Sequence, residues 1–154
     1  MADYSVDEAR HSVVFKRRLA VSVEQAFALW TQPAHVAQWW DPSDQPLREC
    51  SIDLRVGGEL RFVAAGQEGP PPFVGRYLEI DPPTRLVFEA MGATGTVSIK
   101  SSGAGSEIEV EIRAPNADAF QALISLGVAA GTAKTLDKLS AYAGLHPTDS
   151  MGEK

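Results

Sequence analysis

The side chains best suited to acid–base or metal chemistry are scattered along this chain of 154 residues. Its three histidines, His11, His35 and His146, are too dispersed to predict a zinc site. His35 falls on a predicted short helix, where it is a partly exposed residue or, as the alternative, a general base. The chain contains no GxSxG, HExxH, Walker-type or GxGxxG motif. The sequence therefore predicts no metal, no cofactor and no catalytic residue.

Arg17 is chemically the more interesting residue, because it interrupts the apolar face of a strand predicted at residues 12–21. A guanidinium that points inward needs a partner, since an unpaired buried charge is costly. One interpretation is a structural ion pair with Glu79 or Glu89. The other is an anchor for an acidic or carbonyl-bearing ligand.

Acidic residues outnumber basic ones, 20 to 14, which gives a net charge of −6. This balance argues against binding to nucleic acids and to anionic membrane surfaces, both of which require clustered cations. Glu107, Glu109 and Glu111 alternate with apolar residues on the last predicted strand. We interpret this row as a solvated face and not as a cation site, because neighbouring carboxylates repel one another.

Three features of the sequence indicate the cellular compartment. Its single cysteine, Cys50, forms no internal disulfide and no CxxC metal site, and is interpreted as a buried strand residue. The polar, acidic N-terminus differs from a signal peptide. No apolar run approaches the ~20 residues that span a bilayer. We expect a cytoplasmic protein.

The first part of the chain predicts one strand and two short helices. The strand at 12–21 is followed by Ser22 and Gln25, which form a capping box at the start of the first helix. Pro33 suits the first turn of the second helix, and Asp41-Pro42 ends it.

Residues 47–114 predict strands separated by turns. The expected strands are 47–55, 59–65, 73–81, 84–91, 94–101 and 106–114. Gly57-Gly58 predicts a tight hairpin with positive φ at both glycines. The segment GQEGPPP, residues 66–72, predicts a loop.

A single long helix is predicted at residues 117–143, after the N-cap Asn116 and before Gly144. Gly127 and Gly131 lie on its apolar stripe, although each costs about 1 kcal/mol of helix propensity. That cost suggests that the glycines allow a close approach to another backbone, or that they leave space beside the helix for another group.

These elements predict an α+β fold with one domain at residues 12–144. Residues 1–11 are expected to be frayed or disordered, and residues 145–154 to form a flexible tail. An antiparallel sheet with one long helix must bury its apolar face on that helix, and a strongly curved sheet achieves this. The two short helices would then close one end.

Three segments resemble the START-like, helix-grip superfamily (SRPBCC), whose fold is also called Bet v-like. They are VFKRRLAVSVEQAFALWTQPAHVAQWW, DLRVGGELRF and FVGRYLEIDPPTRLVFEA. Within the superfamily they are most similar to the branch named for homologues of the activator of the heat-shock-protein-90 ATPase. The resemblance covers roughly residues 12–143. In one departure, Gly131 is followed by Thr132, where the family usually has tryptophan.

The resemblance implies a cavity between the sheet and the C-terminal helix that binds a small, mostly hydrophobic ligand. Arg17 or Tyr77 would provide polar contacts. The candidate lining residues are Trp40, Leu60, Phe62, Tyr77, Phe88, Phe120, Ile124 and Val128.

The adjacent tryptophans Trp39 and Trp40 have three interpretations: core packing, a lid over a ligand, or a surface for a partner. We expect Trp39 to be core and Trp40 to lie at the mouth of the cavity.

Two other functions remain as alternatives. One is an enzyme like the polyketide cyclases and aromatases, in which Tyr77, Glu79 or Arg17 would polarise a carbonyl. The other is a protein-interaction domain, either co-chaperone-like or a homodimer that uses a sheet edge or a helix. Chaperone stimulation in this branch belongs to longer proteins with a second domain, so we expect no chaperone partner.

Overall fold

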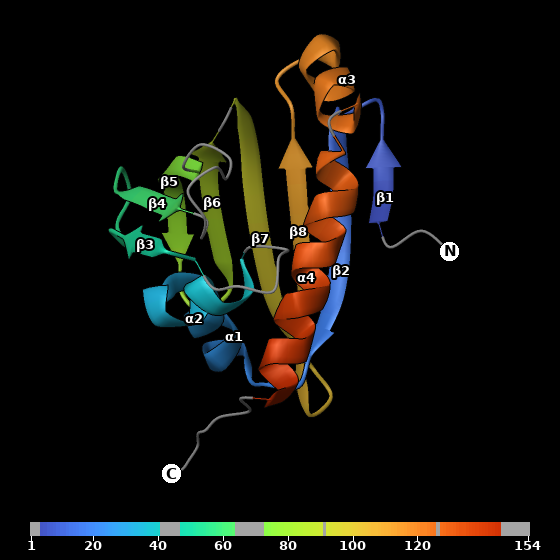
Figure 1. Cartoon of the computed structure of the whole chain (residues 1–154). Helices are drawn as coiled ribbons and strands as arrows, with labels where there is room; N and C mark the ends of the chain where they lie inside the picture. Colours follow the sequence, from blue (N-terminus) through green and yellow to red (C-terminus); the bar gives the residue numbers. More distant parts are fainter. Residues whose placement is uncertain (1–3, 41–46, 64–72, 91, 126, 146–154) are drawn as a thin grey trace.

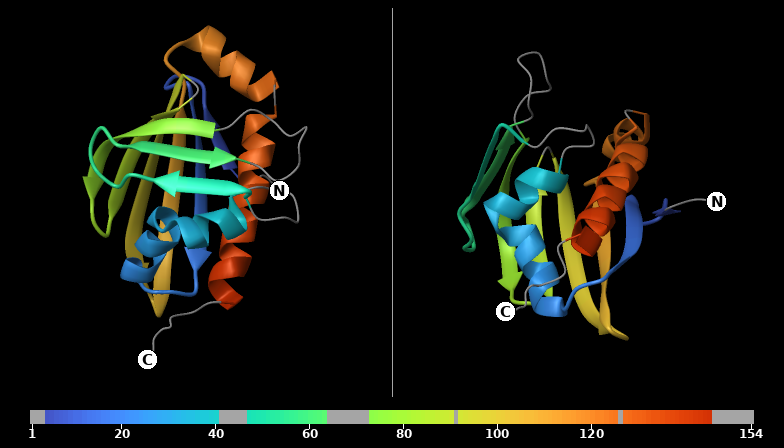
Figure 2. Two further views of the ribbon diagram at one scale, coloured as in Figure 1. Left: turned by 60° about the vertical axis from the view of Figure 1, so that its left-hand side comes forward. Right: turned by 60° about the horizontal axis from the view of Figure 1, so that its bottom comes forward.

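The computed structural model describes residues 4–40, 47–63, 73–90, 92–125 and 127–145. The predicted helix stop at Asp41-Pro42, the loop at 66–72, His146 and the tail at 146–154 lie outside these residues. The described part forms one antiparallel sheet and four helices (Figures 1 and 2).

The sheet has eight strands in the order β1-β2-β8-β7-β6-β5-β4-β3. The strands are β1 (Tyr4–Asp7), β2 (Ser12–Leu19), β3 (Glu49–Ile52), β4 (Glu59–Val63), β5 (Phe73–Asp81), β6 (Arg85–Ala90), β7 (Ala93–Ser102) and β8 (Gly105–Arg113). The helices are α1 (Val23–Thr31), α2 (Pro33–Trp39), α3 (Ala117–Ser125) and α4 (Val128–Leu145).

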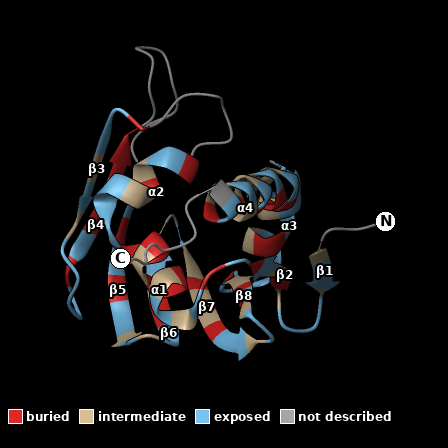
Figure 3. Ribbon diagram, turned by 90° about the horizontal axis from the view of Figure 1, so that it is seen from below, coloured by how far each residue is buried: buried red, intermediate tan, exposed pale blue. Residues whose placement is uncertain are grey.

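The sheet curves around α4, which lies along β2, while α1 and α2 cover one end of the concave face (Figure 2). Buried residues lie on α1, α2, α4 and the strands around them, and exposed residues face outward (Figure 3). The predicted α+β helix-grip fold is therefore confirmed.

Local sequence signals account for much of this arrangement. Ser22 and Gln25 form the predicted capping box: the Gln25 amide donates to the Ser22 hydroxyl at 3.2 Å, and the Ser22 amide donates to the Gln25 side chain at 3.3 Å. Pro33 occupies the first turn of α2, as predicted. On β8, Ile108 and Val110 are buried and alternate with the glutamates.

The N-terminal segment is not entirely frayed. The prediction for residues 1–11 is wrong for Tyr4–Asp7, which forms β1 and pairs with β2. The Tyr4 ring packs against Phe15, with the ring centroids 5.5 Å apart. Four residues with few apolar side chains carry almost no periodic signal, so the pairing depends on the strand beside them.

The predicted single C-terminal helix is interrupted, and Gly127 is the reason. This glycine has φ +77°, a left-handed conformation that ends α3, and its amide donates to the Ile124 carbonyl at 3.1 Å. A Cβ built at Gly131 would meet no described atom within 4 Å, so close backbone approach does not explain that glycine. Gly144 also differs from the prediction, since it lies inside α4 and does not end the helix.

The turn at Gly57-Gly58 also differs from the predicted tight hairpin. Residues 53–58 connect β3 to β4, and only Gly57 has a positive φ, +84°. Gly58 is required for another reason, because a Cβ there would overlap the Asp53 carbonyl oxygen.

Replacing Gly131 with alanine is expected to stabilise the protein by about 0.5–1 kcal/mol, because alanine has the higher helix propensity and the site has room. Gly127→Ala is the matched control and should destabilise, since alanine disfavours the positive φ found there. Urea denaturation measures both changes. A destabilised Gly131→Ala variant would show that the space beside Gly131 is needed.

Candidate functional site

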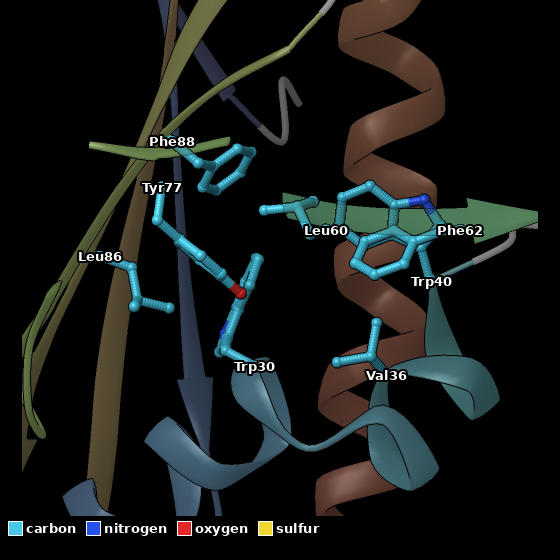
Figure 4. Close-up of a pocket in the computed structure, with 8 residues that line it drawn as sticks. All are labelled: Trp30, Val36, Trp40, Leu60, Phe62, Tyr77, Leu86 and Phe88. Carbon is cyan, nitrogen blue, oxygen red and sulfur yellow. The ribbon is translucent and has the colours of Figure 1, made fainter. Parts of the chain in front are cut away.

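A small apolar pocket lies between α1–α2 and strands β4, β5 and β6 (Figure 4). It is lined by Trp30, Val36, Trp40, Leu60, Phe62, Tyr77, Leu86 and Phe88. Its cavity volume is about 10 Å³, which is roughly the space that one water molecule requires. The described site is therefore closely packed and concentrated at the end of the sheet that the short helices cover.

The pocket brings together part of the predicted ligand site. Among the predicted residues, it contains Trp40, Leu60, Phe62, Tyr77 and Phe88. Whether these residues bind a ligand stays a prediction.

Three lining residues were not predicted, although each had a detectable signal. Trp30 lies on the inner face of the first helix, and Val36 shares a helical stripe with Trp40. Leu86 is two residues from Phe88 on β6, and alternation places both on one face.

The other predicted residues lie away from this pocket. Phe120 is buried on α3, with its ring centroid 6.1 Å from that of His11. Ile124 is exposed on the same helix, and Val128 is half-buried at the start of α4. The described pocket thus faces α1–α2, and the predicted contribution from the C-terminal helices is not seen there.

Arg17 has a partner that the sequence did not indicate. Its Nε donates to Asp137 Oδ1 at 3.0 Å, and its guanidinium also donates to the Ala133 carbonyl at 3.3 Å. Both partners are on α4, so Arg17 connects β2 to that helix. The predicted partners were wrong in identity; Glu79, for instance, instead accepts from Arg85 Nε at 2.9 Å. Because Asp137 is largely exposed, we expect the ion pair to contribute only ~0–1 kcal/mol.

The acidic row on β8 is compensated by cations from neighbouring segments. Glu107, Glu109 and Glu111 pair with Lys100, Lys16 and Arg10 at 3.1, 3.9 and 3.0 Å, respectively. Within the described ranges, no three histidine, cysteine or acidic side chains cluster as a metal site.

The two adjacent tryptophans occupy different environments. Trp39 is 1% exposed, and its indole N–H donates to the Leu29 carbonyl at 2.9 Å. Trp40 is half-buried and lines the pocket, where its ring centroid lies 4.7 Å from that of Phe62 and 4.9 Å from that of Phe73. Trp39 is therefore a core residue, and Trp40 forms part of an aromatic wall.

Two polar groups belong to the pocket lining, and both are neutral. Trp30 is 7% exposed, and its Nε1 has no hydrogen-bond partner among the described residues. Tyr77 is 3% exposed; burial, with a smaller contribution from Cys50, raises its pKa to about 12. Burial also raises the pKa of the Cys50 thiol to about 11. The Tyr77 hydroxyl and the Cys50 thiol therefore stay protonated at neutral pH.

The backbone on both sides of Tyr77 is held by the turn before β4. The Gly57 amide donates to the Tyr77 carbonyl at 2.8 Å, and the Tyr77 amide donates to the Gly58 carbonyl at 3.0 Å. These bonds extend the β4–β5 pairing and fix the direction of the tyrosine side chain.

His35 is half-buried on α2, in agreement with the interpretation as a partly exposed helix residue, and it has a partner that the sequence did not indicate. Its Nδ1 lies 2.7 Å from the Tyr142 hydroxyl, a hydrogen bond that connects α2 to α4. Burial raises the pKa of Tyr142, which favours the neutral phenol in this pair. His35 is not among the residues that line the pocket.

Comparison with solved structures supports this fold. A protein from Arthrobacter aurescens has a TM-score of 0.84 at 16% identity, covering 98% of this chain and 97% of the other. One from Mycobacterium smegmatis has a TM-score of 0.80 at 18% identity, with 94% and 98% covered. One from Rhodobacter sphaeroides has a TM-score of 0.78 at 24% identity, with 87% and 92% covered. At these identities the similarity establishes the fold alone.

No curated protein matches the chain. Among the described helices, none is both long enough and apolar enough to cross a membrane. The family described as "Activator of Hsp90 ATPase homolog 1-like protein" matches residues 20–144, which contain all the residues that line the pocket. The chain therefore belongs to this family of START/Bet v1-type domains.

Proposed function

We propose that the protein binds a small, mostly hydrophobic molecule in the pocket between α1–α2 and strands β4–β6. The observation that carries this proposal is the gathering of apolar and aromatic side chains around two neutral polar groups. Such a combination is typical of ligand sites, where apolar walls provide affinity and a few polar groups fix orientation.

A ligand requires more space than the described cavity of about 10 Å³ offers, so binding must displace a side chain. Trp40 is the best candidate because it is half-buried and follows directly after the end of α2. Leu60 and Tyr77 are almost fully buried and lie on paired strands, which leaves them less freedom. The ligand would therefore replace part of the Trp40 ring against Phe62.

Catalysis of the cyclase or aromatase type receives less support. Of the three residues expected to polarise a carbonyl, only Tyr77 lines the pocket. Arg17 pairs with Asp137, and Glu79 pairs with Arg85. The described pocket thus lacks the paired acid and base that general acid–base catalysis requires.

The proposal can be tested with N-phenyl-1-naphthylamine, an uncharged hydrophobic probe whose emission increases in apolar surroundings. Saturable binding to the purified protein is expected. Phe88→Leu should weaken it about three- to tenfold, because one aromatic contact contributes ~0.5–1.5 kcal/mol. Native mass spectrometry provides a second readout of any small molecule that co-purifies.

Phe120→Leu is the matched control, since this residue is also a buried phenylalanine but lies away from the pocket. It should leave probe affinity unchanged. Absence of saturable binding, or equal weakening by both variants, would contradict the proposal.

A further inference from the structure

The indole N–H of Trp30 is the most informative polar group of the pocket. It is buried without a partner among the described residues, whereas the N–H of neighbouring Trp39 donates to the Leu29 carbonyl at 2.9 Å. The two rings pack edge to face, 4.8 Å apart. Native proteins rarely leave a buried donor unsatisfied, so an N–H in a pocket that has no partner among the described residues is available to donate to a ligand.

The Tyr77 hydroxyl is a second donor at the same end of the pocket. Figure 4 shows the Tyr77 side chain pointing toward Trp30, on the side away from Trp40 and Phe62. Its pKa of about 12 keeps the phenol protonated, and therefore able to donate, throughout the physiological range. The backbone bonds from Gly57 and Gly58 hold this strand in place.

The charge of the lining restricts the ligand further. None of the described residues that line the pocket is charged. Arg17, the expected partner for an acidic ligand, is bonded to Asp137 on α4. A carboxylate or an ammonium group would therefore lose its hydration without gaining a counter-ion, which is strongly unfavourable.

The volume of the pocket is large enough for one small acceptor atom. The described volume of about 10 Å³ admits a single oxygen-sized group beside the lining side chains. The rings of Phe62 and Phe73, stacked with their centroids 5.7 Å apart, suit contact with a flat ring in the place of the Trp40 ring, which lies 4.7 and 4.9 Å from them.

We infer that the ligand is an uncharged aromatic carbonyl compound whose oxygen accepts a hydrogen bond from Trp30 Nε1, with the Tyr77 hydroxyl as the second donor. This inference rests on the proposed function and specifies its ligand class. The aromatic ring takes the place that Trp40 vacates, and the carbonyl oxygen occupies the polar end of the pocket.

Three naphthalene probes that differ in one group provide the test. They are 2-acetylnaphthalene, its near-isostere 2-isopropenylnaphthalene, in which CH₂ replaces the oxygen, and the anion 2-naphthoate. Equilibrium dialysis gives each dissociation constant without relying on tryptophan fluorescence. The ketone should bind about three- to tenfold more tightly than the alkene, the size of one net hydrogen bond, and naphthoate should bind most weakly.

Trp30→Phe keeps a ring but removes the N–H, so it should abolish the preference for the ketone while leaving alkene affinity within about twofold. Tyr77→Phe should reduce the same preference in part. Trp39→Phe is the control: it lowers stability, but it should leave the ketone-to-alkene ratio unchanged, because its N–H bonds to Leu29.

Each result has a distinct meaning. Equal binding of ketone and alkene, or a ketone preference that survives Trp30→Phe, would overturn the inference while the apolar pocket stands. Failure of all three probes, together with N-phenyl-1-naphthylamine, would overturn the proposed function itself. Should Trp30→Phe not fold, the wild-type ratio and the Tyr77→Phe ratio decide the question.

Discussion

Replacing Trp39 with alanine is expected to lower the free energy of unfolding by about 3–5 kcal/mol, the range for removal of a large buried aromatic side chain. Trp39 is 1% exposed, packs edge to face on Trp30, and donates its N–H to the Leu29 carbonyl. The substitution creates a cavity and removes the hydrogen bond from Trp39 on α2 to the Leu29 carbonyl on α1. Urea denaturation measures the loss.

Trp40→Ala is the matched control at the adjacent position. Its ring is half-buried and contacts Phe62 and Phe73, so we expect a smaller loss of about 1–2 kcal/mol. The same substitution should enlarge the pocket. Equal losses for the two variants, or a larger loss for Trp40→Ala, would contradict the assignment of Trp39 to the core and Trp40 to the pocket wall.

Much of the fold was predictable because its signals are local. The Ser22–Gln25 capping box fixes the start of α1 whatever surrounds it. The alternation around Ile108 and Val110 likewise defines both faces of β8. Tyr4–Asp7 was missed because such a short segment is a strand only when β2 lies beside it.

The break between α3 and α4 shows a different limit. Gly127 and Gly131 occupy equivalent places on the predicted apolar stripe, yet only Gly127 adopts a positive φ. Sequence spacing cannot distinguish the two glycines. Which of them adopts a positive φ depends on where each helix packs and not on the residue type. The predicted ligand site depended on that single helix, since it placed Phe120 and Val128 on one continuous helix beside the cavity, whereas they lie on α3 and α4.

The strand side of the candidate site was easier to predict than its helix side. Leu60 and Phe62 alternate on β4, which places both on the concave face. The partner of Arg17 was not predictable, because Asp137 meets it only through the position of α4 on β2. The unpartnered state of the Trp30 N–H is likewise a property of the packed structure.

Tyr77 is expected to make the protein less stable at alkaline pH. Its pKa is about 10 in the unfolded chain and about 12 in the folded protein, because burial disfavours the phenolate. Above pH 10 the unfolded state therefore holds fewer protons, and the free energy of unfolding falls as pH rises. The stabilising contribution is fully present below pH 10 and is lost as pH rises through 12, where the loss amounts to about 2 kcal/mol.

Tyr77→Phe isolates this effect, since phenylalanine fills the same space and does not ionise. The loss of stability between pH 9 and pH 11, measured by urea denaturation, should be smaller in Tyr77→Phe than in the wild type by about 1–1.5 kcal/mol. Tyr4→Phe is the matched variant, because it removes the hydroxyl of a half-buried tyrosine on the edge strand β1, away from the pocket. Cys50, whose pKa is also raised by burial, is present in all of these proteins. Identical pH profiles for Tyr77→Phe and the wild type would mean that the Tyr77 hydroxyl reaches water, and the pocket would then lack the dry polar end that favours an uncharged ligand.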